Sequence, residues 1–98
     1  MKKIKILSLN VKGVRDPTKR RAIFRWVKKQ NSDITFLQET YSLECEINML
    51  KNEWGEGKLF VSGGTTHSKG CIVLIRSGVE TTVNEVEIDT KGRYILLN

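Results

Sequence analysis

The sequence predicts a mixed α/β chain in which a strand–helix–strand (βαβ) unit is followed by antiparallel hairpins. Two apolar, β-prone runs, residues 4–9 (IKILSL) and 34–37 (ITFL), flank a basic stretch with helical spacing at residues 17–30. Short apolar runs separated by turn residues then fill residues 58–97, which is typical of antiparallel strands. The 98 residues suit one domain or part of one.

The first strand and the first helix follow from local patterns. Both faces of residues 4–9 are largely apolar, so we predict a strand at the centre of a sheet. Asp16 can cap free amides and Pro17 suits the first helical position, so the helix is predicted to run from Pro17 to about Gln30. Its apolar stripe is predicted to consist of Ile23, Phe24, Trp26 and Val27, and its solvated surface of Lys19, Arg20, Arg21, Arg25, Lys28 and Lys29.

The second strand, in the segment DITFLQET (residues 33–40), carries Glu39 at its end. A helical crossover makes its two strands parallel, so Asn10 and Glu39 are expected at the same carboxyl edge of the sheet, where ligands bind. Mg²⁺ prefers oxygen ligands and often takes only one or two protein carboxylates, so Glu39 with Asn10 could anchor it. Two alternatives stay open: Glu39 marks a strand running into a loop, and Asn10 is a turn former.

The second half of the chain reads as a short helix and a series of strands. The helix is expected at residues 44–51 and a turn at 52–57, followed by strands at 58–62, 71–76, 81–88 and 93–97. His67 is the only histidine, and its loop of Gly, Thr and Ser favours a solvated residue over a general base. Trp26 and Trp54 are interpreted as packing residues rather than platforms for base stacking. The two cysteines form no CxxC pair, so neither a disulfide framework nor a zinc site is expected.

Positive charge is concentrated near the N-terminus. Residues 1–30 contain eleven Lys or Arg and one acid, a local charge of +10, whereas residues 31–98 contain six basic and ten acidic residues, a local charge of −4. Such clustering suits a polyanion such as DNA, because Lys and Arg release counterions from phosphates, and a solvated helix face is the alternative. No apolar run approaches the roughly 20 residues of a membrane span, so no membrane partner is expected.

The stretch from Leu7 to Tyr41 resembles the start of the endonuclease/exonuclease/phosphatase superfamily. The pattern N-x-x-G from Asn10 to Gly13 and the triplet Gln38-Glu39-Thr40 carry this resemblance. Further elements resemble the endonuclease domain of LINE-type (non-LTR) retrotransposons, over essentially the whole chain. These elements are Asp16-Pro17 with Lys19-Arg20, Glu53-Trp54-Gly55, the loop from Gly64 to Gly70 before CIVLI, and Gly92-Arg93-Tyr94.

The resemblance implies a two-sheet, DNase I-like α/β sandwich and a metal-dependent endonuclease that nicks DNA to prime reverse transcription. Glu39 and Asn10 would then hold Mg²⁺, or Mn²⁺, and Asn10 would also help place the scissile phosphate. Lys12 and Arg15, which follow Asn10, are the candidates for contact with DNA. DNA is the expected partner, no small-molecule cofactor is expected, and the chain is expected to be a monomer.

Two departures from the family pattern refine this expectation. Lys12 stands where repair relatives carry an Asp, which favours the retrotransposon branch. The family's later motifs, a Tyr, an Asp-x-Asn pair, an Asp and a Ser-Asp-His, have no counterpart before the core-like strand RYILL meets the end at Asn98. Residues 1–98 are therefore expected to form the N-terminal half of the domain and to be inactive alone. The alternatives are a repair nuclease or phosphoesterase of the same superfamily, and a non-catalytic basic module that binds nucleic acid.

Overall fold

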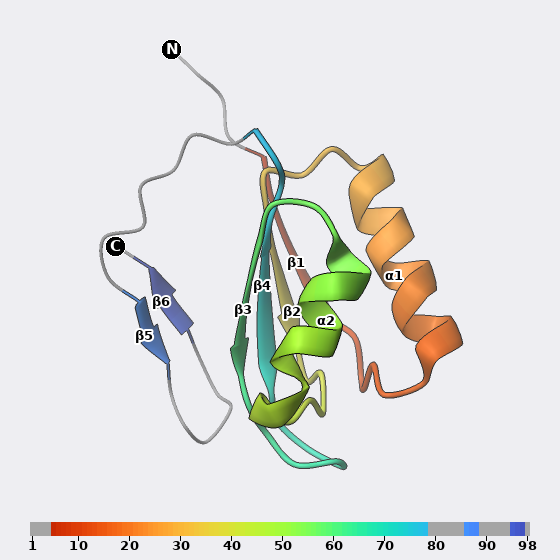
Figure 1. Cartoon of the computed structure of the whole chain (residues 1–98), viewed down its shortest axis with the longest axis vertical. Coiled ribbons are helices and arrows are strands. Elements are labelled where there is room, and N and C mark those ends of the chain that lie inside the picture. The colour runs from red at the N-terminus through yellow and green to blue at the C-terminus, as the bar shows by residue number, and fades with distance from the viewer. Residues whose placement is uncertain (1–4, 79–85, 89–94, 98) are drawn as a thin grey trace.

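The computed structural model describes residues 5–78, 86–88 and 95–97. A four-stranded sheet in the order β1-β2-β4-β3 forms its centre, and two helices cover one face of this sheet (Figure 1). The elements are β1 (Ile6–Asn10), α1 (Pro17–Lys29), β2 (Ile34–Gln38), a 3-10 turn η1 (Glu44–Glu46), α2 (Ile47–Trp54), β3 (Lys58–Ser62), β4 (Cys71–Ile75), β5 (Val86–Ile88) and β6 (Ile95–Leu97). The predicted mixed α/β class is confirmed.

The strand pairing confirms the strand–helix–strand unit and corrects the place of its first strand. β1 and β2 are parallel, β4 is antiparallel to β2 and to β3, and β5 pairs antiparallel with β6. Within the described residues, however, β1 stands at the end of the sheet order instead of at its centre, and Ile6 is 58% exposed. The prediction failed because apolar composition reports what lies above and below a strand, and not which strands lie beside it.

Most element ends agree with the predictions within about two residues, and the second helix is the main exception. α2 runs on through Trp54, where a turn was predicted, and Gly55 ends it in the left-handed conformation with φ +63°. Residues 81–85 of one predicted strand and residues 93–94 of another lie outside the described residues. None of the helices in the described part is long and apolar enough to cross a membrane.

The main core lies between the helices and one face of the sheet. Leu37 and Ile72 from the sheet and Phe24 from α1 are at most 2% exposed and belong to one cluster of buried side chains. The rings of Phe24 and Trp54 meet edge to face with their centroids 5.8 Å apart. Trp54 is therefore a packing residue, as predicted.

Two residues of α1 lie on the opposite side of the helix from the one predicted. Trp26 is 43% exposed, whereas Arg20 is only 4% exposed. Arg20, Phe24 and Val27 are spaced four and three residues apart, so they lie along one face of the helix, and that face is buried. Trp26 follows Phe24 by two residues, which turns it about 200° around the helix axis and away from the core.

Arg20 is buried because α2 supplies a carboxylate for its guanidinium. Its Nε and Nη2 donate to the two carboxylate oxygens of Glu53, the second over 2.8 Å. Its Nη1 donates to the carbonyl oxygens of Val14 and Arg15, over 3.1 and 3.2 Å. This single side chain therefore ties α1 to α2 and holds the loop that leads from β1 into α1.

The same ion pair predicts a loss of stability in acid. Hydrogen bonds from Arg20 hold the pKa of the Glu53 carboxyl below its usual value. A depressed folded-state pKa means that the stabilisation is present above the unfolded-state pKa of about 4.3 and is lost as the pH falls through the lower folded-state value. We expect the urea midpoint, followed by circular dichroism, to fall between about pH 5 and pH 3 and to fall less in Glu53→Gln. Equal falls in both proteins would contradict this assignment.

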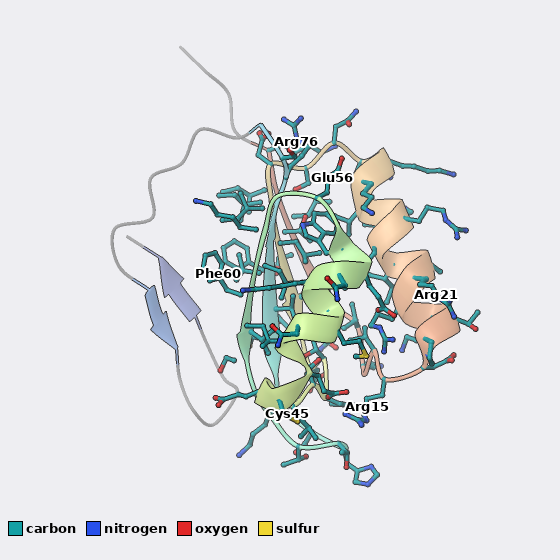
Figure 2. The ribbon with its side chains drawn as sticks, in the orientation of Figure 1. Arg15, Arg21, Cys45, Glu56, Phe60 and Arg76 are labelled. Carbon is teal, nitrogen blue, oxygen red and sulfur yellow. The ribbon has the colours of Figure 1, made fainter. Side chains whose placement is uncertain are left out.

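The sheet face opposite the helices is apolar, and the described residues cover it only in part. Val73 and Ile75 are buried there, whereas Phe36 and Phe60 are half-buried. β6 contacts β3 and β4, and the β5–β6 pair lies on this side of the sheet (Figure 1). Figure 2 shows Phe60 on this side, away from the helices. This face can accept a further layer of structure.

Candidate functional site

The residues proposed for chemistry lie where β1 and β2 end. The parallel register pairs Asn10 with Gln38 at the last position of both strands, so Asn10 and Glu39 emerge at the same carboxyl edge. The two chains stay hydrogen-bonded beyond the strands. The amide of Val11 donates to the carbonyl of Gln38 (3.0 Å), and the amide of Gly13 donates to the carbonyl of Glu39 (2.6 Å). The loop after β1 therefore holds the main chain of Glu39.

The backbone at this edge is strained. Five of the described non-Gly residues have a positive φ, and four of them lie here: Lys12 (+48°), Glu39 (+53°), Tyr41 (+58°) and Lys69 (+63°). The amide of Tyr41 donates to the carbonyl of Lys69 over 2.8 Å, which joins the segment after β2 to the loop before β4. Such conformations cost on the order of 1–3 kcal/mol each and concentrate at ligand sites. The strained backbone therefore indicates a candidate ligand site at this edge, without any argument from the side chains.

Two glycines allow these segments to approach. Gly13, from the N-x-x-G pattern, has φ +92°, and a Cβ there would lie 2.5 Å from a ring carbon of Tyr41. Gly70 has φ +91°, and a Cβ there would lie 2.7 Å from Oγ1 of Thr40. The turn at Gly13 thus needs glycine both for its backbone conformation and for the aromatic ring beside it.

The side chains of Glu39 and Asn10 are both exposed. The Glu39 carboxylate makes no hydrogen bond or ion pair with any described residue. The Oδ1 atom of Asn10 accepts from the amide of Lys12 over 3.3 Å, which closes a local turn. The turn-forming alternative for Asn10 is therefore observed, and it leaves the amide N–H groups of Asn10 for a ligand.

The two candidate DNA contacts differ in their surroundings. Nη1 of Arg15 forms an ion pair with Glu46 (2.7 Å) and donates to the carbonyl of Tyr41 (3.3 Å), although 39% of the side chain remains exposed. The side chain of Lys12 is exposed and has no partner in the described part of the chain. Arg15 therefore supports the loop structure, and Lys12 is the cation left for an external anion.

Sequence reasoning missed two residues that shape this edge. Nζ of Lys19 donates to the carbonyl oxygens of Val11 (2.7 Å) and Lys12 (3.2 Å), so the first turn of α1 holds the loop after β1. Thr40 is completely buried, and its Oγ1 has no hydrogen-bond partner among the residues that the structure describes. The only signal for Thr40 was its place in the Gln38-Glu39-Thr40 triplet, which predicts nothing about burial.

The groups at this edge fit a hard divalent cation held by few protein ligands. Glu39 offers a carboxylate that has no partner among the described residues, and Asn10 offers an amide oxygen whose second lone pair stays open while the first accepts from the Lys12 amide. In the described residues no three or more His, Cys, Asp or Glu side chains gather in one place. A carboxylate and an amide oxygen could hold a cation of the Mg²⁺ type, which takes most of its ligands from water and substrate phosphate.

The sequence predicted His67 to be a solvated loop residue rather than a general base. Its side chain is exposed in the loop between β3 and β4, and its backbone amide donates to Oγ1 of Thr65 over 3.2 Å. This is a local Thr turn of the kind that surface loops form. The solvated loop residue predicted from the sequence is therefore confirmed.

A comparison with known families supplies an independent observation. The model of the Endonuclease/Exonuclease/phosphatase family matches residues 7–97 of this chain. The matched segment contains Asn10, Gly13 and Glu39, and it extends from β1 to β6.

Proposed function

This chain belongs to the endonuclease/exonuclease/phosphatase family, and from this premise we propose that it forms the metal-binding part of a DNA-nicking endonuclease of a LINE-type retroelement. Members of the family are nucleases or phosphoesterases and generally depend on a divalent metal. The four-stranded sheet with its two helices is a partial DNase I-like fold. The proposal therefore adds three points to the family: DNA as substrate, Glu39 as metal ligand, and the retroelement class.

One observation supports the metal site above all: the exposed carboxylate of Glu39 has no partner among the described residues, although its backbone is held in a strained conformation. A surface Glu without a function needs neither the left-handed φ of +53° nor the hydrogen bond between Gly13 and its carbonyl. Strain of this kind persists only where the surroundings enforce it, and it is common at ligand sites. The strain thus supports a positioning role for this edge.

The proposed chemistry assigns a role to each exposed side chain at the edge. Glu39 and the Asn10 amide oxygen would hold Mg²⁺ or Mn²⁺, which when bound stabilises negative charge on the phosphate and on the leaving oxygen. The Asn10 amide N–H groups would donate to a nonbridging phosphate oxygen and orient it. Lys12 would contact the DNA backbone beside the scissile bond. Lys12 also supports the retroelement branch, because repair relatives carry an acid at this position.

We also propose that the complete catalytic site needs residues beyond those described. The apolar face with Phe36 and Phe60, which the described residues cover only in part, supports this, because a sheet with helices on one face normally buries its other face against a second layer. That layer would bring the general base and a second phosphate ligand to the edge. Residues 1–98 are accordingly proposed to be a partial domain that binds metal without nicking DNA.

Metal binding by Glu39 is tested with Mn²⁺, whose binding can be followed by electron paramagnetic resonance. We expect Glu39→Gln to weaken Mn²⁺ binding by at least about tenfold, because even supporting residues around a metal change affinity by 10–100-fold. The matched control is Glu56→Gln, which removes the same charge near the opposite end of the sheet (Figure 2). Equal binding by Glu39→Gln and the parent chain would refute the ligand assignment.

Nicking of supercoiled plasmid by the same proteins, with Mg²⁺ or EDTA, tests the catalytic part. Mg²⁺-dependent nicking that disappears in Glu39→Gln would support the site and overturn the proposal that residues 1–98 are inactive alone. Metal binding without nicking would support both. Cleavage that persists in EDTA would contradict the metal-dependent mechanism.

A further inference from the structure

A basic groove lies between α1 and α2. It is an open depression of about 200 Å³, lined by Arg21, Phe24, Arg25, Lys28 and Glu53. Arg21, Arg25 and Lys28 are spaced four and three residues apart, so their side chains lie along one face of α1. Figure 2 shows Arg21 part way along α1, whereas Arg15 lies nearer to the edge where β1 and β2 end. The groove is thus a surface separate from the candidate metal site.

Within the described part of the chain, the three cations of the groove form no ion pair. Arg21 donates its Nε to the carbonyl of Pro17 over 3.1 Å, and Arg25 has no hydrogen bond or ion pair with a described residue. Nζ of Lys28 stands 5.3 Å from the ring centroid of Trp54, which orients a cation without removing its charge. A surface of three such cations attracts an anionic ligand.

The negative charge of Glu53, the acidic residue that lines the groove, is neutralised by Arg20. Both carboxylate oxygens of Glu53 accept hydrogen bonds from the buried Arg20, and these bonds also keep the pKa of Glu53 low. The charges of Glu53 and Arg20 therefore cancel. The groove keeps the full charge of Arg21, Arg25 and Lys28.

The shape and the spacing select among anionic ligands. Small-molecule pockets enclose roughly 300–1,000 Å³, so this smaller, open groove suits a chain that crosses it more than a compact molecule. Arg21 and Lys28 are seven residues apart along α1, or about 10 Å at 1.5 Å per residue. One strand of a duplex carries a charge every 3.4 Å or so along its axis, so this length spans about three phosphates.

We propose that this groove binds the phosphate backbone of a nucleic acid, as a second contact surface apart from the metal site. The binding depends on Arg21, Arg25 and Lys28 and requires neither a divalent metal nor Glu39. A nuclease with this surface keeps hold of a nucleic acid while its catalytic edge is empty. Because phosphates are the ligand, the groove accepts DNA and RNA backbones alike.

The test measures binding of a labelled DNA duplex of about 20 base pairs by fluorescence anisotropy, in EDTA and over a series of salt concentrations. We expect Arg21→Ala/Arg25→Ala to weaken binding by at least about tenfold at physiological salt and to reduce the salt slope by about 2, since each lost phosphate contact contributes about 0.9. An RNA duplex of equal length is expected to show the same loss. A loss confined to one polymer would overturn recognition of the backbone.

The matched control is Lys51→Ala/Lys58→Ala, which removes two exposed cations that do not line the groove. This control is expected to change affinity less than about threefold, because long-range charge is largely screened at physiological salt. Equal weakening in both double variants would show that net charge alone governs binding and would refute the groove. Glu39→Gln is expected to bind the duplex in EDTA like the parent, so failure of the metal site leaves this result intact.

Discussion

The Arg20→Ala variant is expected to lose about 3 kcal/mol of the free energy of unfolding, because removal of one partner leaves a largely buried ion pair uncompensated. The change strips the Glu53 carboxylate of its two donors and leaves the carbonyl of Val14 without one. It also opens a cavity at a side chain that is 4% exposed. Domains of this kind are stable by only about 5–15 kcal/mol, so the variant is expected to be near the limit of folding.

Urea denaturation at near-neutral pH measures this loss, with Arg25→Ala as the control on the exposed face of the same helix. The control is expected to stay within about 0.5 kcal/mol of the parent. Arg20→Lys is expected not to rescue, because an ammonium group cannot bind both carboxylate oxygens in the planar geometry of a guanidinium. Arg20→Met/Glu53→Leu is expected to be more stable than Arg20→Ala, since it leaves no buried charge unpaired. An Arg20→Ala midpoint equal to that of the parent would refute the structural role.

The Gly13→Ala variant is expected to lose about 1–3 kcal/mol of folding free energy through backbone strain and to lose affinity for Mn²⁺ as well. Gly13 has φ +92°, and the added methyl group would have to displace the ring of Tyr41. That displacement disturbs the 2.6 Å hydrogen bond from the amide of Gly13 to the carbonyl of Glu39. The N-x-x-G pattern is thus proposed to act on the metal site through the backbone of Glu39.

Gly78→Ala is the control that distinguishes general backbone strain from displacement of Tyr41. Gly78 has φ +87°, but no atom lies within 4 Å of an added Cβ. This control is expected to lose stability and to bind Mn²⁺ like the parent chain. Urea denaturation measures the stability and electron paramagnetic resonance measures the Mn²⁺ affinity, on the same set of proteins. Unchanged Mn²⁺ affinity in Gly13→Ala would remove the proposed link between the glycine and Glu39.

The sequence by itself determined the elements whose signals are local. Asp16 caps α1 as predicted, with its Oδ1 accepting from the amide of Thr18 over 3.2 Å, and Pro17 is the first residue of the helix. The parallel strand–helix–strand unit, and with it the common edge of Asn10 and Glu39, followed from apolar runs on either side of an amphipathic stretch. These features were predictable because capping and helical spacing depend on near neighbours in the chain, and because a helical crossover joins parallel strands.

The tertiary structure alone decided which polar residues are buried and where the strain lies. Arg20 and Trp26 are six residues apart, and composition assigned each to the wrong side of α1. Glu53, which lies 33 positions after Arg20, explains why Arg20 is buried. A guanidinium can leave water only where a carboxylate and carbonyls replace its hydration. The left-handed backbone of Glu39 likewise depends on the loop at Gly13. The position of β1 at the end of the sheet order depends on which strands pair with one another. Such features arise from contacts between distant segments, so no local pattern in the sequence predicts them.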